Sequence, residues 1–202
     1  GLGDVYKRQG QLYDMSEMMM AIYVEPDLAK ILLSKCSEFI LKYIRSLKET
    51  GVDGIIMAEP AAGLLSNDDA TIFSTNYIKP IVETVQNENF LFVLHNCGNT
   101  GHCTQSMIDS GARALHFGNQ CDIVSALQQV PSDRIVMGNL DPVGIFKSSS
   151  PKQVYDETER LLHVTTDFDN FIISTGCDVP PGVSLENINA FYRAVEIFRN
   201  RH

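Results

Sequence analysis

The chain has 202 residues, a formal net charge of −9 and 44% hydrophobic residues. This length suits one domain or part of a larger one, and the hydrophobic content can supply a core, which argues against disorder. The acidic balance and the lack of a Lys/Arg cluster argue against nucleic acid and membrane as partners, and no apolar run approaches the roughly 20 residues that span a bilayer.

The first segment of the chain, GLGDVYKRQ, shows no apolar periodicity. Its DVYKRQ part is the translation of GATGTGTATAAGAGACAG, the end of a transposon adaptor used to prepare sequencing libraries. We therefore interpret residues 1–9 as a sequencing artefact and exclude them from the fold. The domain is then expected to cover residues 10–202 and to lack its N-terminal part. The alternative is an ordinary polar loop.

Helix and strand patterns alternate along the rest of the chain. An amphipathic helix is predicted to begin at Pro26 and to end before Gly51. Five short apolar strands follow: VDGIIMAEP, FLFVLHNCG, ALHFGN, RIVMGNLDP and FIISTGC. Helices are expected at about residues 68–86, 100–110, 122–130, from 150 and from 185. Ser150 and Gln153 predict a capping box, and Ser184 is predicted to cap the last helix.

Continuous apolar strands that alternate with helices are typical of a parallel α/β fold. An open doubly wound sheet would carry a glycine-rich phosphate turn after an early strand, and this sequence has none. Polar or reactive side chains instead follow the carboxyl end of every strand, as in a (β/α)8 TIM barrel. They are Glu59, His95, Cys97, Asn119, Asn139, Asp141, Cys177 and Asp178. We predict a partial barrel, the C-terminal five βα units of a TIM barrel.

Three of these residues suggest a metal site. His95 and Cys97 are two residues apart at a strand end, so their side chains point the same way, and Cys177 returns to the same barrel mouth. One histidine and two cysteines are a ligand set that zinc favours, and three protein ligands leave a fourth position for substrate or water. The alternatives are a hydrogen-bonded structural histidine and small buried cysteines. The five cysteines are more typical of thiols or metal ligands in a reducing cytoplasm than of disulfides.

Other sulfur and imidazole groups lie near this set in the sequence. His102 and Cys103 are rival ligands, but we expect them on the following helix, in packing or solvent-exposed roles. His116 lies inside the strand ALHFGN, where it either lines the barrel or is a hydrogen-bonded core histidine. The methionine-rich run at residues 15–20 is expected to fill gaps in an apolar surface, with an apolar ligand site as the alternative.

Four segments in order, GVDGIIMAEPAAG with LLS, HNCGNT, GNLDP and GCDVPPG followed by ENI, resemble the uroporphyrinogen decarboxylase superfamily over about residues 12–200. That family has a (β/α)8 barrel with its active site at the C-terminal face. It divides into uroporphyrinogen decarboxylases and zinc-dependent, corrinoid-linked methyltransferases such as the methylcobamide:coenzyme M enzymes. His95, Cys97 and Cys177 match the methyltransferase pattern of His-x-Cys and a later Cys, which the decarboxylases lack.

The resemblance implies an enzyme that holds Zn²⁺ on these three residues. It would transfer methyl groups between methylcobamide, carried by a partner corrinoid protein, and a small thiol or methylated substrate. Zinc would hold the thiol as a thiolate, which is the nucleophile. We expect a cytoplasmic protein.

The resemblance also suggests roles for five other polar residues. Glu59, in the place of an acidic residue before proline, and Asp178 are the candidate catalytic residues. Glu59 could instead be a fourth zinc ligand, contact substrate or cap the next helix. Asn99, Asn139 and Asp141 are the candidate substrate-binding residues, and the last two could instead orient the mouth loops through hydrogen bonds.

Two other functions compete with methyl transfer. A metal-free decarboxylase of a tetrapyrrole carboxylate would need Arg or Lys at the mouth, and the mouth loops in this sequence are poor in both. A non-catalytic barrel could bind a molecule at its mouth without any reactive residues. The intact set of His95, Cys97 and Cys177 argues against this function.

Overall fold

The computed structural model describes residues 2–3 and 14–201. Parallel strands form one sheet in the order β1-β2-β3-β4-β5-β6. Their bounds are β1 Leu2–Gly3, β2 Gly54–Ala58, β3 Leu91–Asn96, β4 Ala114–Phe117, β5 Ile135–Leu140 and β6 Phe171–Thr175. Every strand lies beside the strand that precedes it in the sequence, which is the arrangement of a TIM barrel. The predicted partial barrel is therefore confirmed, with the five expected strands as β2 to β6.

The short strand β1 lies within the segment that we interpret as a sequencing artefact. Leu2 and Gly3 pair with Met57 and Ala58 of β2. The rest of residues 1–9 lies outside the described residues. The origin of the segment therefore stays a prediction.

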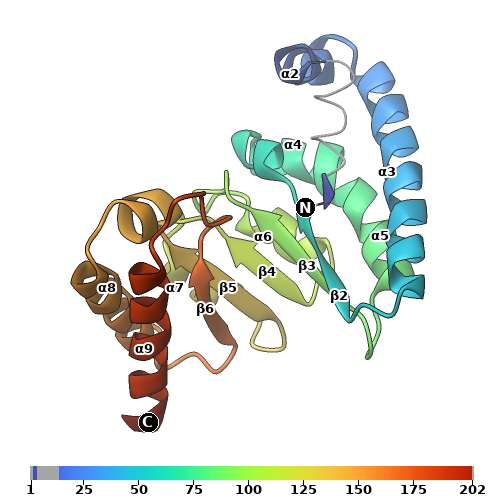
Figure 1. Ribbon diagram of the computed structural model, residues 1–202. Coiled ribbons are helices and arrows are strands. Elements are labelled where there is room, and N and C mark those ends of the chain that lie inside the picture. The colour runs from blue at the N-terminus through green and yellow to red at the C-terminus, as the bar shows by residue number, and fades with distance from the viewer. Residues whose placement is uncertain (1, 4–13, 202) are drawn as a thin grey trace.

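Helices cover the outer side of the curved sheet (Figure 1). Their bounds are α2 Met15–Val24, α3 Pro26–Glu49, α4 Asn67–Ala70, α5 Asn76–Val85, α6 Thr104–Asp109, α7 Ile123–Gln129, α8 Pro151–Val164 and α9 Leu185–Arg201. A 3-10 helix spans Pro60–Leu64, and π-helical turns span Thr71–Thr75 and Pro142–Lys147. In Figure 1, α3 and α5 lie at one end of the sheet and α8 and α9 at the other. Within the described residues, no helix is long and apolar enough to cross a membrane.

The core lies between the sheet and these helices. Side chains alternate between the two faces of a strand, so every second residue of β2 to β5 points toward the helices. One such row runs across the sheet through Met57, Leu94, Leu115 and Val136, and each is at most 3% exposed. The opposite face is concave and less covered, as the 52% exposure of Ile56 indicates.

Two predicted helices differ from the expectation, and one further helix was not predicted. The helix expected over residues 68–86 is divided by the π turn Thr71–Thr75. The helix expected from about Thr100 begins at Thr104, because the Asn99 side chain accepts hydrogen bonds from the N–H groups of Gly101 and Cys103 and holds this segment in a turn. The methionine-rich run forms α2, and Met18 is fully buried.

The loops that follow β2 and β3 touch backbone to backbone. A Cβ at Gly63 would lie 2.2 Å from the carbonyl carbon of Gly98, which no real side chain tolerates. The Asn96 side chain accepts hydrogen bonds from the N–H groups of Gly98 and Asn99, both at 3.1 Å. The loop that carries the HNCGN segment is therefore fixed by its neighbour and by its own strand.

Both predicted helix caps at the C-terminal end are confirmed. Ser150 accepts from the N–H of Gln153, and the Gln153 side chain accepts from the N–H of Ser150, which completes the capping box of α8. The Ser184 hydroxyl accepts from the N–H of Asn187 at the start of α9.

Replacing Ser150 by alanine should lower the free energy of unfolding by about 1 kcal/mol, because the N–H of Gln153 loses its side-chain acceptor. Urea denaturation at 25 °C measures this value. Ser46→Ala is the control, since Ser46 is exposed on α3 and the expected change stays within about 0.5 kcal/mol. Equal stability of Ser150→Ala and the wild type would contradict the capping contribution.

Candidate metal centre

The register of the sheet places two histidines side by side. Ala58 pairs with His95, His95 with His116 and His116 with Met137, so these residues form one row across β2 to β5. The row lies on the concave face, opposite the buried row that packs against the helices. The two imidazole rings are 4.4 Å apart between centroids and tilted by 35°.

This row forms the floor of a cavity of about 490 Å³ at the carboxyl ends of the strands. Its lining residues are Ile56, Ala58, Pro60, His95, Cys97, His116, Met137, Ser174, Thr175, Cys177, Asp178 and Val179. They come from β2 to β6 and from the segments that follow β2, β3 and β6. Asp178 is the only charged side chain in this set when the histidines are neutral, so a bound molecule meets a largely apolar wall.

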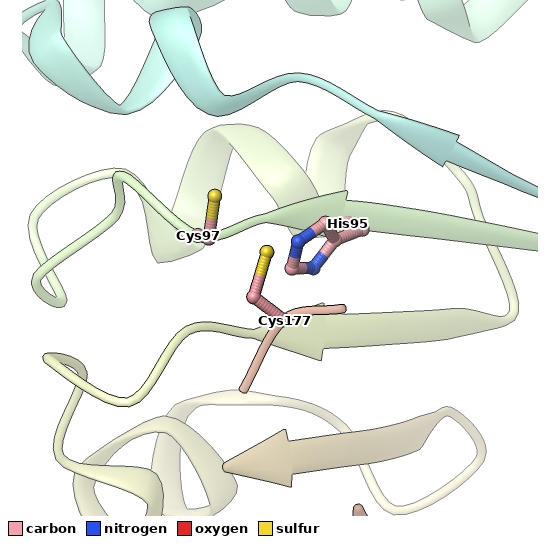
Figure 2. A group of neighbouring side chains, drawn as sticks. All are labelled: His95, Cys97 and Cys177. Carbon is pink, nitrogen blue, oxygen red and sulfur yellow. The ribbon is translucent and has the colours of Figure 1, made fainter. Parts of the chain in front are cut away.

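The three predicted metal ligands converge in this cavity. One ring nitrogen of His95 and the sulfurs of Cys97 and Cys177 all lie within 4.8 Å of one another. Figure 2 shows His95 near the end of β3, Cys97 just beyond it, and Cys177 approaching both from the segment after β6. Parallel strand ends bring these groups together although they lie far apart in the sequence.

A backbone hydrogen bond selects the protonated nitrogen of His95. Its Nδ1 lies 3.2 Å from the carbonyl oxygen of His116. A carbonyl oxygen only accepts, so Nδ1 carries the proton and donates. The other nitrogen, Nε2, then has a free lone pair, and it is buried without a hydrogen-bond partner. This tautomer is the one that a metal-ligating histidine requires.

Burial keeps the His95 ring neutral. The pKa of His95 is lowered to about 4, mainly by desolvation and to a smaller extent by the adjacent His116. The bond to the His116 carbonyl and the negative charge of Asp178 raise the pKa but do not compensate. Burial also lowers the pKa of His116. Both rings are therefore uncharged at neutral pH, and a neutral imidazole is the form that binds metals.

The backbone of Cys97 is held by a close neighbour. A Cβ at Gly118, in the loop after β4, would lie 2.6 Å from the Cys97 carbonyl oxygen and 2.7 Å from its Cα. Only glycine leaves room for this approach. The place of the Cys97 sulfur therefore depends on the absence of a side chain at position 118.

The segment that carries Cys177 is fixed by hydrogen bonds at both of its ends. The N–H of Gly176 donates to the carbonyl of Leu140 at 2.7 Å, and the Thr175 hydroxyl donates to the carbonyl of Cys177 at 2.7 Å. His116 Nε2 lies 2.8 Å from the Thr175 carbonyl and 3.0 Å from the Ser174 hydroxyl. Sequence reasoning left open whether His116 lines the barrel or is a bonded core residue, and both descriptions apply.

The two carboxylates chosen as catalytic candidates lie in different places. Asp178 is exposed and lines the cavity beside Cys177. Glu59 is 2% exposed and does not line the cavity. Its side chain accepts a hydrogen bond from the Ser74 hydroxyl, and its N–H donates to the His95 carbonyl at 2.8 Å. It stands at the N-cap position of the 3-10 helix but makes no side-chain cap.

The three candidate substrate-binding residues are not part of the cavity wall. Asn99 is fully buried, with its amide directed to Gly101, Cys103, Thr104 and Met107. The Asn139 side chain donates to the carbonyls of Gly118 and Cys121, at 3.0 and 2.6 Å. Asp141 caps the N–H groups of Val143 and Gly144, both at 2.8 Å. These contacts orient loops, which was the alternative considered for Asn139 and Asp141.

The rival ligands His102 and Cys103 also lie elsewhere. His102 is not on a helix as expected, because it belongs to the turn that Asn99 holds before α6, and its Nε2 donates to the carbonyl of Leu65 at 2.9 Å. Cys103 is fully buried at the N-cap of α6, and burial raises the pKa of its thiol to about 11. Through their contacts with the Leu65 carbonyl, both residues connect the loop after β3 to the segment after β2.

Two curated proteins with different activities are similar to this chain. Methylcobamide:CoM methyltransferase MtbA of Methanosarcina acetivorans is 28% identical over 181 residues, which cover 89% of this chain and 51% of MtbA. Uroporphyrinogen decarboxylase of Saccharophagus degradans is 27% identical over 190 residues, which cover 92% of this chain and 53% of the decarboxylase. The chain spans about half the length of both relatives.

A solved structure supports the fold. The structure of a methyltransferase from Methanosarcina mazei superimposes with a TM-score of 0.86 at 22% sequence identity. The match covers 98% of this chain and 58% of the methyltransferase. At this identity the likeness concerns the fold alone.

The match to a family model settles the classification. The model described as uroporphyrinogen decarboxylase (URO-D) matches residues 9–198, nearly the whole of the chain. This agrees with the strand order, with the cavity at the carboxyl ends of the strands and with the order of the HNCGNT, GNLDP and GCDVPPG segments. The chain belongs to the uroporphyrinogen decarboxylase family.

Proposed function

We propose that this protein is a zinc-dependent methyltransferase that moves a methyl group between methylcobamide on a partner corrinoid protein and a small thiol or methylated substrate. The observation that carries the proposal is the convergence of His95, Cys97 and Cys177. The similarity to methylcobamide:CoM methyltransferase MtbA supports the same reaction class.

The donor set fits zinc on two grounds. One nitrogen and two sulfurs are the ligands of known catalytic zinc sites that keep a fourth position open. The buried lone pair of His95 Nε2 has no hydrogen-bond partner, and such a group costs free energy unless it is satisfied. Zinc in this place would bind a substrate thiol and lower its pKa, so that the thiol is present as a thiolate at neutral pH.

The reaction that we propose is a direct displacement. The substrate thiolate attacks the methyl carbon of methylcobamide, a carbon–sulfur bond forms and the cobalt–carbon bond breaks. Cobalt keeps the electron pair and changes from Co(III) to Co(I). The proton of the thiol has left before the attack, and we assign its uptake to Asp178, which lines the cavity at its exposed rim. The reverse step describes transfer from a methylated substrate to reduced corrinoid.

The remaining side chains assist this reaction by orienting the reactants or by fixing the strands and loops around the cavity. The cavity wall holds the thiol and the methyl carbon in line, which can contribute several kcal/mol to the lowering of the barrier. Glu59, bonded to Ser74 and to the His95 carbonyl, fixes the end of β2 against β3, so we propose a positioning role for it instead of a catalytic one. Asn99, Asn139 and Asp141 act in the same way on the loops.

A metal-free decarboxylase remains the second candidate because the family and several relatives carry that activity in their names. Its substrate would be a tetrapyrrole with several carboxylates, and cationic side chains would be needed to bind them. Among the described residues, no Lys or Arg lines the cavity, and Asp178 would repel a carboxylate. The charge of the site therefore favours methyl transfer.

Zinc content tests the metal site. The protein expressed from its complete gene should contain about one zinc per chain, and Cys177→Ser should contain little, because one of three protein ligands is lost. Atomic emission after gel filtration gives the ratio. Cys36→Ala is the matched control, since Cys36 is buried on α3 and outside the cavity. Full zinc content in Cys177→Ser would contradict the assignment.

Methyl transfer tests the reaction itself. Anaerobic incubation of the zinc-loaded protein with methylcobalamin and a panel of small thiols should convert methylcob(III)alamin to cob(I)alamin, which visible absorbance follows. The metal-free protein and Cys177→Ser should show only the uncatalysed rate, since no thiolate is held in place. Release of CO₂ from uroporphyrinogen by the Cys97→Ala, Cys177→Ala double variant would favour the decarboxylase instead.

The close approach of Gly118 to Cys97 gives a third test. Gly118→Ala should weaken zinc binding about 10-fold or more, because the added methyl group displaces the Cys97 backbone. Competition with a chromophoric chelator measures the affinity. Gly51→Ala is the control: no atom lies within 4 Å of the added methyl group, and Gly51 does not line the cavity, so zinc affinity should not change although its φ of 86° strains the backbone of the variant. Equal zinc affinity of Gly118→Ala and Gly51→Ala would contradict the role of the approach.

A further inference from the structure

We propose that His116 is a positioning residue that holds Cys177 in place relative to His95 and Cys97. This inference rests on the proposed zinc site, for which His116 supplies no ligand. The two parts of the ligand set come from β3 with the residue after it and from the segment after β6. His116 on β4 contacts His95 on β3 and the last two residues of β6, which precede that segment.

The side chain of His116 reaches across a neighbouring strand. β4 pairs with β3 and β5 only, and β6 lies beyond β5. His116 Nε2 nevertheless lies 2.8 Å from the Thr175 carbonyl and 3.0 Å from the Ser174 hydroxyl, both on β6. Since a carbonyl only accepts, Nε2 carries the proton and donates. The bond therefore links β4 to the end of β6 over the concave face.

The linked residues lead directly to the metal ligand. Cys177 comes two residues after Thr175, beyond the last residue of β6. The Thr175 hydroxyl donates to the Cys177 carbonyl at 2.7 Å, and the Ser174 hydroxyl donates to the Thr175 carbonyl at 3.0 Å. Any shift of Thr175 is thus passed to Cys177. The N–H of His116 Nε2 therefore restrains Thr175, the last residue of β6, from which the chain continues to Cys177.

The other side of His116 restrains His95. The rings lie 4.4 Å apart, and the His116 carbonyl accepts from His95 Nδ1. His116 thereby defines the direction of the His95 lone pair with its backbone and the place of Cys177 with its side chain. Residues that orient metal ligands in this way commonly change metal affinity by 10- to 100-fold when they are replaced.

Two substitutions separate the hydrogen bond from the packing of the ring. His116→Phe keeps an aromatic ring against His95 but removes the donor. His116→Gln removes the ring but places an amide N–H near the position of Nε2. The backbone carbonyl that binds His95 remains in both variants. His163→Phe is the control, because His163 is exposed on α8 and packs edge-on against Phe198, away from the cavity.

The experiment measures zinc affinity by chelator competition in the protein expressed from its complete gene. The visible spectrum of the cobalt(II)-substituted protein then reports the geometry of the site. His116→Phe should bind zinc about 10- to 100-fold more weakly and show weaker, shifted cobalt bands. His116→Gln and His163→Phe should stay close to the wild type in both measurements. A loss of packing alone would lower the thermal stability of His116→Phe but would leave the cobalt spectrum unchanged.

Wild-type affinity and spectrum in His116→Phe would overturn the inference and leave the proposed function intact. Equal losses in the Gln and Phe variants would also overturn it, because the donor would then not be the cause. If wild-type protein binds no zinc, the proposed function fails and the inference fails with it. Should His116→Phe not fold, Ser174→Ala removes one of the two partners of Nε2, and a weaker zinc affinity in that variant would support the inference while wild-type affinity would overturn it.

Discussion

The candidate site depends on the bond from His95 Nδ1 to the His116 carbonyl. It decides which nitrogen keeps its lone pair, and it is set by the register of β3 and β4 rather than by another side chain. A shift of one residue in this register would turn His95 toward the helices and remove it from the cavity. The geometry of the ligand set is thus built into the pairing of the sheet, and burial keeps the ring neutral so that the lone pair remains available.

Membership of a family does not choose between the activities that the family contains. The same barrel supports methyltransferases and decarboxylases, and a fold alone does not imply a function. The choice comes from side chains on the concave face, where this chain has two histidines, two cysteines and one carboxylate. A site of this composition favours the proposed methyl transfer over the recognition of several carboxylates. The side chains of the cavity therefore carry more information about function than the overall likeness does.

Much of this arrangement could be predicted from the sequence. Apolar runs predict β2 to β6. Because parallel strands end at one edge of a sheet, the sequence also predicts that Cys177 lies near His95 and Cys97. The late start of α6 was missed because it depends on hydrogen bonds of the Asn99 side chain. The sequence leaves the roles of Asn139 and Asp141 open because it shows that a residue lies at the end of a strand but not which way its side chain points. The reach of His116 to β6 needs the curvature of the sheet, which no local pattern encodes.

The separation of Cys97 and Cys177 along the chain has a consequence for folding. A metal ion held by both would close a loop that contains all of β4, β5 and β6. In the unfolded chain such a closure costs entropy, which grows with the logarithm of loop length. Assembly of these strands removes that cost, so metal uptake is favoured late in folding. Once bound, the ion would act as a cross-link that opposes the separation of β6 from the rest of the sheet.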